Sequence, residues 1–236
     1  MPDRKSGNGE KTIPSKSRKA FTIAFRVLVL SCSIIGISIL MIDAKSLPAA
    51  LSLFNYYTIQ SNLLVVLAMG IGIWEAAKDR EQPFLLGLFT SGVVLWILVT
   101  GIVYHMLLAG SWHPTGAVAI ATQLLHTVTP LGMVLNWLVF EKKGRYQYKY
   151  AIYWLSYPFI YMIVSWVRGW LTGFFPYWFL NPTEPYPKGA GSLTGMLTTV
   201  GILSIGFYCL GILIVFLDRV MVRGKRMQNA TAKSSE

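Results

Sequence analysis

The sequence Asn55-Tyr56-Tyr57-Thr58-Ile59-Gln60-Ser61-Asn62 leads directly into the apolar run 63–73. It places hydroxyl and amide side chains on a segment that is otherwise apolar enough to cross a membrane. Polar groups in a hydrocarbon layer cost free energy unless they find partners, so they usually face a bundle interior or a wet cavity. We therefore expect this stretch to form a polar face inside a bundle of membrane helices.

The composition indicates an integral membrane protein. Of the 236 residues, 54% are hydrophobic and 13% are charged, and the mean hydropathy is +0.51, which is outside the range of ordinary soluble domains. A helix needs roughly 20 apolar residues to cross a bilayer. Six stretches qualify, namely 20–43, 52–75, 84–108, 117–140, 150–172 and 193–218. The predicted fold class is all-α, an integral membrane bundle of six transmembrane helices (20–218) between two basic tails (1–19 and 219–236).

The basic residues are distributed unevenly between the two sides of this bundle. Of the 21 Lys and Arg, 17 fall on the side that holds both termini, against Lys45 and Lys188 on the other side. This asymmetry predicts that both termini are cytoplasmic and that the basic residues touch anionic headgroups. It argues against nucleic acid as the reason for the net charge of +11, and no obligate protein partner is predicted. Arg26, inside the first span, is expected to snorkel toward the headgroups.

The second span is expected to begin near Pro48, with Ser46 as its N-cap. Thr58 would then lie on the order of 15 Å below the outer end of that helix. Asn55, Thr58, Ser61 and Asn62 recur at spacings of three and four, so they share one helical face. Hydrogen bonding between helices is the simpler use of such a face, and the spacing alone favours it.

The fourth span is a second polar helix. Gln123, His126, Thr127 and Pro130 again lie three or four residues apart. Because Pro130 has no N–H, the backbone carbonyl of His126 should be free and the helix should bend there. The alternative is a buried neutral histidine that a neighbouring carbonyl or hydroxyl satisfies.

Several chemistries can be compared on these residues. The three histidines lie eight and thirteen residues apart, and acidic residues are scarce within the spans, so neither a metal nor another cofactor is predicted. A transporter would be supported by internal repeats, and none is evident. Thr58 and His126 have similar expected depths, about 15 and 14 Å. They could therefore face each other as nucleophile and base.

The chain resembles the androgen-induced-gene family of six-span membrane proteins and its bacterial relatives over residues 20–218. The segments that carry this resemblance are 54–64 (FNYYTIQSNLL), 124–131 (LLHTVTPL), and Arg168-Gly169 followed by 177–181 (YWFLN). Animal members of the family are threonine hydrolases that cleave fatty acid esters of hydroxy fatty acids. The resemblance implies that Thr58 is the nucleophile and His126 the catalytic histidine. Asn136 and Asn181 stand where bacterial relatives often carry Asp, which puts activity in question.

We therefore expect an intramembrane lipid-ester hydrolase whose pocket opens toward the outer leaflet of the cell or cytoplasmic membrane. Asn62 or Gln123 would donate to the oxyanion, and Arg168 would bind the carboxylate of a fatty acid. Asn55 and Ser61 would support Thr58, and the loop 173–192 would form a cap. A dyad without an orienting carboxylate should be slow, unless Asp43 reaches the site. The alternatives are a non-catalytic lipid-binding protein, an amphiphile transporter and, less favoured, a metal-dependent membrane hydrolase.

Overall fold

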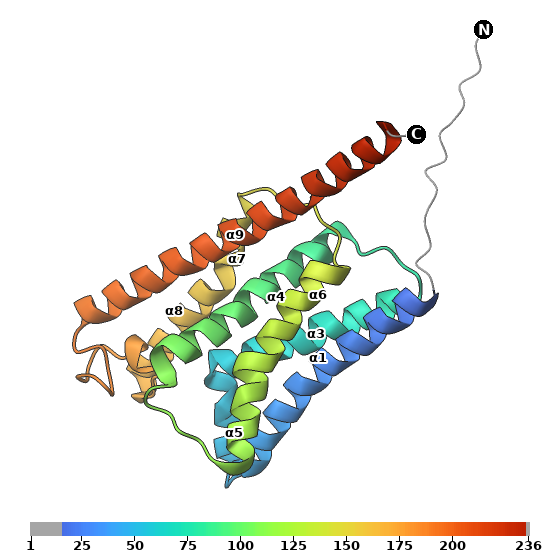
Figure 1. Cartoon of the computed structure of the whole chain (residues 1–236). Coiled ribbons are helices and arrows are strands. Elements are labelled where there is room, and N and C mark those ends of the chain that lie inside the picture. Colours follow the sequence, from blue (N-terminus) through green and yellow to red (C-terminus); the bar gives the residue numbers. More distant parts are fainter. Residues whose placement is uncertain (1–15, 235–236) are drawn as a thin grey trace.

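The computed structural model describes residues 16–234, with side chains for residues 16–222. All regular secondary structure in the described chain is helical, and six helical segments are long and apolar enough to cross a membrane. The all-α class is therefore confirmed, and so is the presence of six helices that could span a membrane (Figure 1). In chain order the elements are α1 (Lys16–Asp43), α2 (Leu47–Ser52), η1 (Leu53–Asn55), α3 (Tyr57–Ala77), α4 (Phe84–Val103), η2 (Tyr104–Leu108), α5 (Gly116–Gln123), η3 (Leu124–Val128), α6 (Thr129–Phe140), α7 (Tyr150–Trp154), α8 (Ser156–Thr172), η4 (Trp178–Leu180) and α9 (Leu193–Ser234).

The helical region is longer than the domain that the sequence predicted. Residues 1–15 of the expected N-terminal tail lie outside the described residues. The first helix already begins at Lys16. The last helix continues to Ser234, well beyond the boundary at 218. Residues 219–234 of the predicted C-terminal tail are therefore helical and continue α9.

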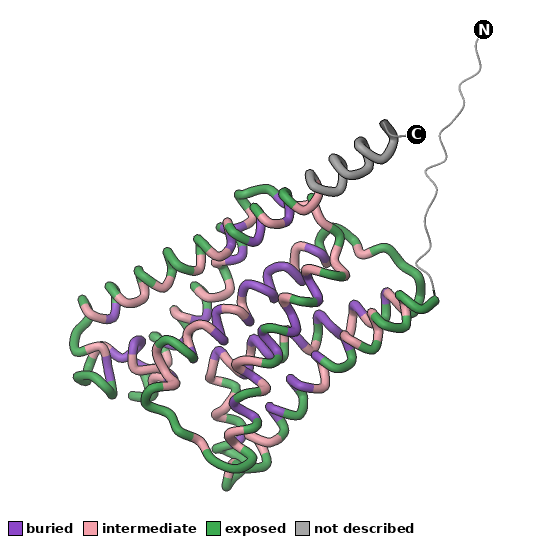
Figure 2. Tube along the Cα trace, viewed as in Figure 1, coloured by how far each residue is buried: buried purple, intermediate pink, exposed green. Residues whose placement is uncertain are grey.

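The long helices run antiparallel, and α1, α3, α4 and the α5–α6 segment pack into the centre of the bundle. Helices α7, α8 and α9 lie beside this group on the side of α4 (Figure 1). Buried residues concentrate where α3, α4 and α6 meet, while α8 and α9 are mostly exposed (Figure 2). Several core residues have no exposed surface, for example Val65, Val93, Leu95 and Met133.

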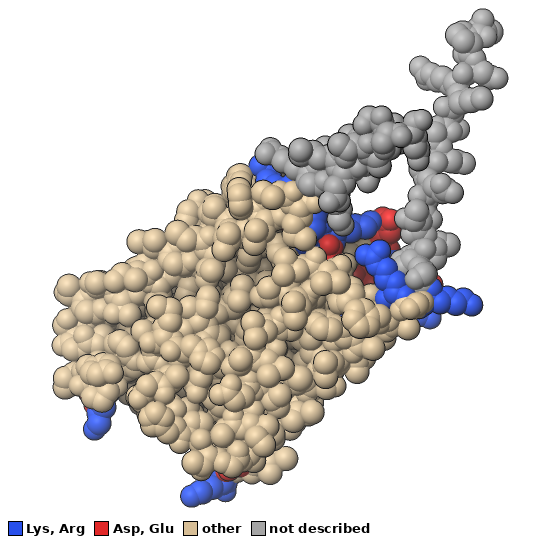
Figure 3. All heavy atoms as spheres, viewed as in Figure 1, with Lys and Arg blue, Asp and Glu red and all other residues tan. Residues whose placement is uncertain are grey.

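Charged side chains gather at one end of the bundle, and the face seen in Figure 3 is otherwise almost free of them. We call this end, where Lys19, Arg80 and Lys142 lie, the basic end. Large apolar side chains are exposed along the flanks between the two ends, for example Leu85 and Trp170. A band of apolar surface between polar ends is what a bilayer requires of a spanning bundle.

The second span begins differently from our expectation. Ser46 does cap a helix, and its hydroxyl accepts a hydrogen bond from the Ala49 N–H. That helix, however, is only the short α2, and the chain becomes extended at Tyr56 (φ −88°, ψ 135°) before α3 starts at Tyr57. Thr58 therefore lies in the first turn of a helix, and not ten residues along one.

A tertiary contact accounts for this break in the helix. The Tyr161 hydroxyl on α8 donates to the Asn55 carbonyl and accepts from the Tyr57 N–H. It thus satisfies one backbone group on each side of Tyr56, which a continuous helix would have paired internally. The prediction that Asn55 shares one helical face with Thr58 is wrong, because the two residues belong to different elements.

The fourth span contains the predicted irregularity at Pro130 in the form of a π-helix, η3. Within it the Thr129 N–H bonds to the Leu124 carbonyl five residues earlier. Such π-turns are rare and occur often at functional sites. The carbonyl of His126 lies against Gly101 of α4, where a Cβ atom would be 2.9 Å from its oxygen. The absence of a side chain at position 101 therefore allows the two helices to approach.

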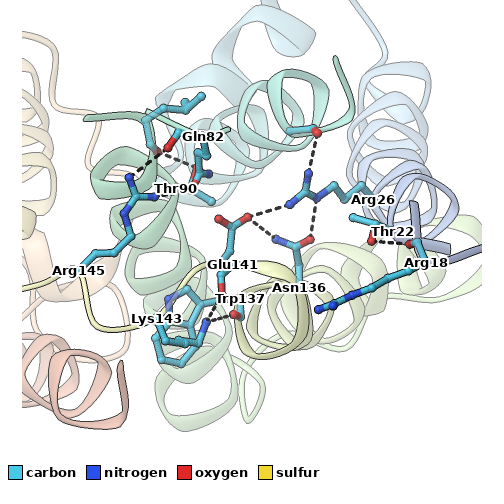
Figure 4. Close-up of polar contacts among 12 residues, drawn as sticks. Arg18, Thr22, Arg26, Gln82, Thr90, Asn136, Trp137, Glu141, Lys143 and Arg145 are labelled. Carbon is cyan, nitrogen blue, oxygen red and sulfur yellow. Dashed lines mark hydrogen bonds and ion pairs between the residues drawn. The ribbon is translucent and has the colours of Figure 1, made fainter. Parts of the chain in front are cut away.

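Arg26 does not snorkel as predicted, and its exposed fraction is only 7%. Its guanidinium donates to Asn136 Oδ1 at 3.0 Å, to the Gly72 carbonyl at 2.6 Å and to Glu141 Oε1 at 3.0 Å (Figure 4). These acceptors come from α3 and from the end of α6, far away in the sequence. These three acceptors stabilise the buried charge of Arg26, so its side chain stays inside the bundle and does not extend to the surface.

Candidate active site

Thr58 and His126 lie in direct contact. The Thr58 Oγ1 is 3.2 Å from His126 Nε2. Thr58 comes from the first turn of α3, and His126 comes from the middle of the π-helix η3. A hydroxyl within hydrogen-bond reach of an imidazole nitrogen is the geometry that an activated nucleophile requires.

The second ring nitrogen of His126 determines the direction of this hydrogen bond. Nδ1 lies 3.0 Å from the backbone carbonyl oxygen of Thr122, one turn earlier. A carbonyl can only accept, so Nδ1 carries the proton and Nε2 of the neutral ring is the acceptor. The Thr58 hydroxyl therefore donates to Nε2. Asp43 is exposed at the end of α1, and the position that it would have occupied as orienting group is taken by the Thr122 carbonyl.

Tyr104 holds the imidazole from its face. The two rings stack with centroids 4.1 Å apart and an interplanar angle of 28°. Tyr104 is buried and begins the second π-helix, η2. Two π-helices on neighbouring spans thus fix the ring of His126 between a stacked aromatic and a backbone carbonyl. Sequence reasoning did not assign a role to Tyr104.

The polar side chains that follow Thr58 hold its backbone. The Ser61 hydroxyl and the Asn62 amide both donate to the Thr58 carbonyl, at 3.1 and 2.9 Å. Asn62 also donates to the Leu125 carbonyl at 3.3 Å, and its own Oδ1 accepts from Ser33. Both amide hydrogens of Asn62 therefore have acceptors, and its side chain is fully buried. The prediction that it donates to an oxyanion is wrong, and instead it ties α3 to η3.

Tyr177 is the site residue that sequence reasoning missed. Its hydroxyl accepts from the Thr58 N–H at 3.4 Å and lies 3.5 Å from Thr58 Oγ1. Because its oxygen is already an acceptor, its own proton is available to a group beside Thr58. Desolvation by the surrounding side chains raises the pKa of Tyr177 above its usual value of 10.0, so the phenol keeps that proton. The aromatic cluster in the loop 173–192 was the signal that could have pointed to it.

An apolar cavity of about 460 Å³ opens beside Thr58. It lies between α4, α8 and α9, and the loop that carries Tyr177 closes one end. Thr58, Tyr177 and Thr100 are among its few polar lining residues, and the remainder is mostly aliphatic and aromatic, including Val99, Met162, Leu203 and Phe207. Such a cavity suits an acyl chain or another apolar ligand.

Arg168 lies near this site, on the last turns of α8. Its guanidinium rests over the Phe174 ring at 5.2 Å, Phe174 contacts Tyr56, and Tyr56 contacts Tyr177. Its Nε and Nη2 atoms are buried, and among the described residues they have no hydrogen-bond partner. Buried donors on a cation are usually paired, so these two atoms are suited to an anionic group of a ligand.

Gln123 lies away from the position that the sequence suggested. Its Oε1 accepts from the Thr127 hydroxyl at 2.9 Å, and that hydroxyl is 3.0 Å from His105 Nε2. Both contacts lie on an exposed surface of α5, η2 and η3. Gln123 is exposed, and among the described residues its side chain bonds to Thr127 and not to Thr58 or His126. The structure therefore does not bring Gln123 to the proposed oxyanion.

Asn136 and Asn181, the two asparagines singled out in the sequence, do not join the Thr58–His126 pair. Asn136 bonds to Arg26 and Glu141 at the basic end. Asn181 organises its own loop, where its Oδ1 accepts from Thr183 and its amide donates to the Lys188 carbonyl. Among the described side chains, no group of three or more His, Cys, Asp and Glu could hold a metal ion.

Comparisons with protein-family models, with curated proteins and with solved structures gave no match. The resemblance to the androgen-induced-gene family therefore stays a prediction. The class of protein that can be stated is an all-helical protein with six potential membrane spans. A threonine–histidine pair lies at the edge of an apolar cavity within it.

Proposed function

We propose that this protein is a lipid-ester hydrolase that works inside the membrane, with Thr58 as nucleophile and His126 as base. The observation that carries the proposal is the contact between Thr58 Oγ1 and the unprotonated His126 Nε2, at 3.2 Å, on the wall of an apolar cavity. A lipid-binding protein would need the cavity, but it would not need a hydroxyl aimed at the free nitrogen of an oriented imidazole.

The reaction would proceed in two stages. Thr58 Oγ1 attacks the ester carbonyl carbon while His126 Nε2 takes the hydroxyl proton, and the Tyr177 hydroxyl donates to the oxyanion. The carbon–oxygen bond to the alcohol breaks, and His126 returns the proton to the leaving oxygen. Water then attacks the acyl–Thr58 ester with His126 as base, which releases the fatty acid and restores the threonine.

The substrate class that we propose is a fatty acid ester of a hydroxy fatty acid or a similar lipid. The apolar cavity would hold one acyl chain, and Arg168 would pair with a free carboxylate through its two unpartnered nitrogens. The resemblance to the androgen-induced-gene family points to the same substrates. It also implies, as the charge distribution does, a multi-pass membrane protein with cytoplasmic termini and a site toward the outer leaflet.

An amphiphile transporter is less well supported, because the two polar regions are separated. The polar cluster around Thr58 extends as far as Asn62 and Thr129. The cluster at the basic end starts at Asn136. Seven residues of α6, or about 10 Å of rise, separate Thr129 from Asn136. Val65, Met69 and Met133 fill that layer and are almost fully buried. A polar substrate has no continuous path through it.

The test is hydrolysis by the purified chain in detergent, with hydroxy-fatty-acid esters and simpler lipid esters as substrates. Thr58→Ala and His126→Ala should abolish turnover, and Thr58→Ser should retain part of it. Thr198→Ala, at an exposed position on α9, is the matched control. A fluorophosphonate probe should label the wild type but not Thr58→Ala. Turnover that survives both alanine substitutions would refute the pair, and turnover lost on chelation would favour a metal-dependent hydrolase.

A further inference from the structure

A second cavity, of about 390 Å³, opens at the basic end of the bundle. It lies between the start of α1, the end of α3 with the loop that follows, and the end of α6. Charged side chains line it, in contrast to the apolar cavity beside Thr58. Its lining includes Lys19, Arg26, Glu75, Arg80 and Glu141. The proposed ester hydrolysis makes no use of this cavity.

The cations near the floor of the cavity are already satisfied. Arg26 uses its three nitrogens on Asn136, Gly72 and Glu141, and Asn136 donates back to Glu141 at 3.2 Å (Figure 4). Arg145 is bonded to the Gln82 side chain and carbonyl. Among the described residues, the Arg26 guanidinium donates to no carboxylate besides Glu141, and the Arg145 guanidinium donates to none.

Glu75 is the carboxylate that this network leaves without a partner. Only 6% of the residue is exposed, and it lines the cavity. Arg26 and Arg145 act on its charge from a distance, but among the described residues its side chain has no hydrogen bond and no ion pair. A buried carboxylate in this state is costly. With Glu141 paired to Arg26, Glu75 is the carboxylate at the floor that can still accept hydrogen bonds from a ligand.

The rim has the opposite sign. Lys19 pairs with Asp79 at 2.7 Å and Lys142 pairs with Glu81 at 3.2 Å. The Arg80 guanidinium stacks over the Trp74 ring at 4.6 Å. The ion pairs of Asp79 and Glu81 are made by Lys19 and Lys142, and not by Arg80. Among the described lining residues, cations therefore exceed carboxylates around the opening. A carboxylate without a hydrogen-bond partner, below a rim with more cations than acids, is complementary to a zwitterion whose ammonium enters first.

We propose that this cavity binds a primary ammonium group with a neighbouring phosphate, which is the chemistry of phosphoethanolamine. The ammonium would donate to Glu75, and Arg80 and Lys19 would contact the phosphate. A metal ion fits less well, because among the described residues the floor has two carboxylates, Glu75 and Glu141, and Arg26 holds one of them. The phosphoethanolamine could belong to a membrane phospholipid or be a soluble molecule.

The experiment uses the full-length protein and follows its thermal unfolding. In detergent, soluble phosphoethanolamine is titrated against phosphocholine, whose quaternary ammonium cannot donate a hydrogen bond. In nanodiscs, phosphatidylethanolamine is compared with phosphatidylcholine. We expect the melting temperature to rise with the ethanolamine compounds and not with the choline compounds. A response to the lipid alone identifies the membrane as the source, and a response to both shows that the headgroup suffices.

Glu75→Gln keeps the shape of the side chain and removes its charge, so it should weaken ethanolamine binding roughly tenfold or more. Arg80→Gln should weaken it less. Glu184→Gln, in the loop at the other end of the bundle, is the matched control and should bind like the wild type. Equal responses to ethanolamine and choline compounds would overturn the proposal without any variant, and so would unchanged binding by a folded Glu75→Gln protein.

Discussion

Nδ1 of His126 lies 3.0 Å from the backbone carbonyl oxygen of Thr122, one turn earlier in the same span. In a catalytic triad a carboxylate occupies this position and stabilises the imidazolium that forms during the reaction. A neutral carbonyl orients the ring and fixes its tautomer, but it stabilises the developing charge less. The proposed dyad is therefore oriented without an intramembrane acid, and its turnover should depend strongly on the local helix geometry.

Pro130→Ala tests that dependence. The substitution restores an N–H at position 130, which would allow the π-helix η3 to relax toward a regular α-helix and turn His126 away from Thr58. We expect at least about a tenfold loss of ester hydrolysis with no loss of thermal stability. Parallel measurements of turnover and melting temperature check this. Full activity in a stable Pro130→Ala protein would show that η3 does not determine the position of His126.

Gly101→Ala should damage the same site from the other helix. A Cβ atom there would lie 2.9 Å from the His126 carbonyl oxygen and 3.3 Å from the Pro130 ring, so α4 and η3 must separate. We expect about 1–3 kcal/mol of destabilisation together with loss of activity. Gly201→Ala is the control, because a Cβ at Gly201 meets nothing within 4 Å. It should stabilise α9 slightly, and a Gly101→Ala protein that behaves the same way would contradict the packing argument.

The features that follow from local pattern were predictable from the sequence. The six spans follow from hydropathy, the cap at Ser46 from its position before Pro48, and the irregular helix from Pro130. The pairing of Thr58 with His126 was suggested by their spacing and depth, and the two side chains do meet. In each case the physical cause lies within a few residues of the feature.

The predictions that were wrong or missing concern features that depend on residues far away in the chain. The break at Tyr56 is held by Tyr161, and the burial of Arg26 depends on Glu141. Tyr177 reaches Thr58 across 119 residues. No local pattern in the segment 55–62 carries information about these partners, so a sequence read without its tertiary contacts misses the helix break before Thr58 and leaves Tyr177 out.

Tyr177→Phe should separate catalysis from packing. The ring keeps its contacts with Tyr56 and Phe179, but the hydroxyl beside Thr58 is lost. Removing one donor to an oxyanion typically lowers turnover on the order of a hundredfold, and we expect the effect in kcat more than in KM. Tyr208→Phe, at an exposed site on α9, controls for the loss of a phenol. Unchanged kcat in Tyr177→Phe would remove Tyr177 from the mechanism.

Arg26→Met should be among the most destabilising single changes at the basic end. It leaves the buried Glu141 without its cation, and breaking such a pair from one side costs about 3–5 kcal/mol. Arg26→Met combined with Glu141→Leu should recover part of that loss, because no lone charge remains buried. Denaturant unfolding in mixed micelles measures both. Lys142→Met breaks only the exposed pair with Glu81 and should cost about 0–1 kcal/mol, so an equal cost for all three proteins would refute the network.

Arg168→Gln tests what the substrate carries at its far end. If Arg168 binds a carboxylate through its two buried, unpartnered nitrogens, the wild type should prefer an ester with a free carboxyl group over the methyl ester of the same compound. Loss of a charge-assisted pair costs about 1.5–3 kcal/mol, so the preference should fall by roughly 10- to 100-fold in kcat/KM. The methyl ester should be hydrolysed almost equally by both proteins, because Thr58 and His126 are untouched. A variant that loses both substrates alike would mean that Arg168 supports the loop at Phe174 and does not recognise the carboxylate.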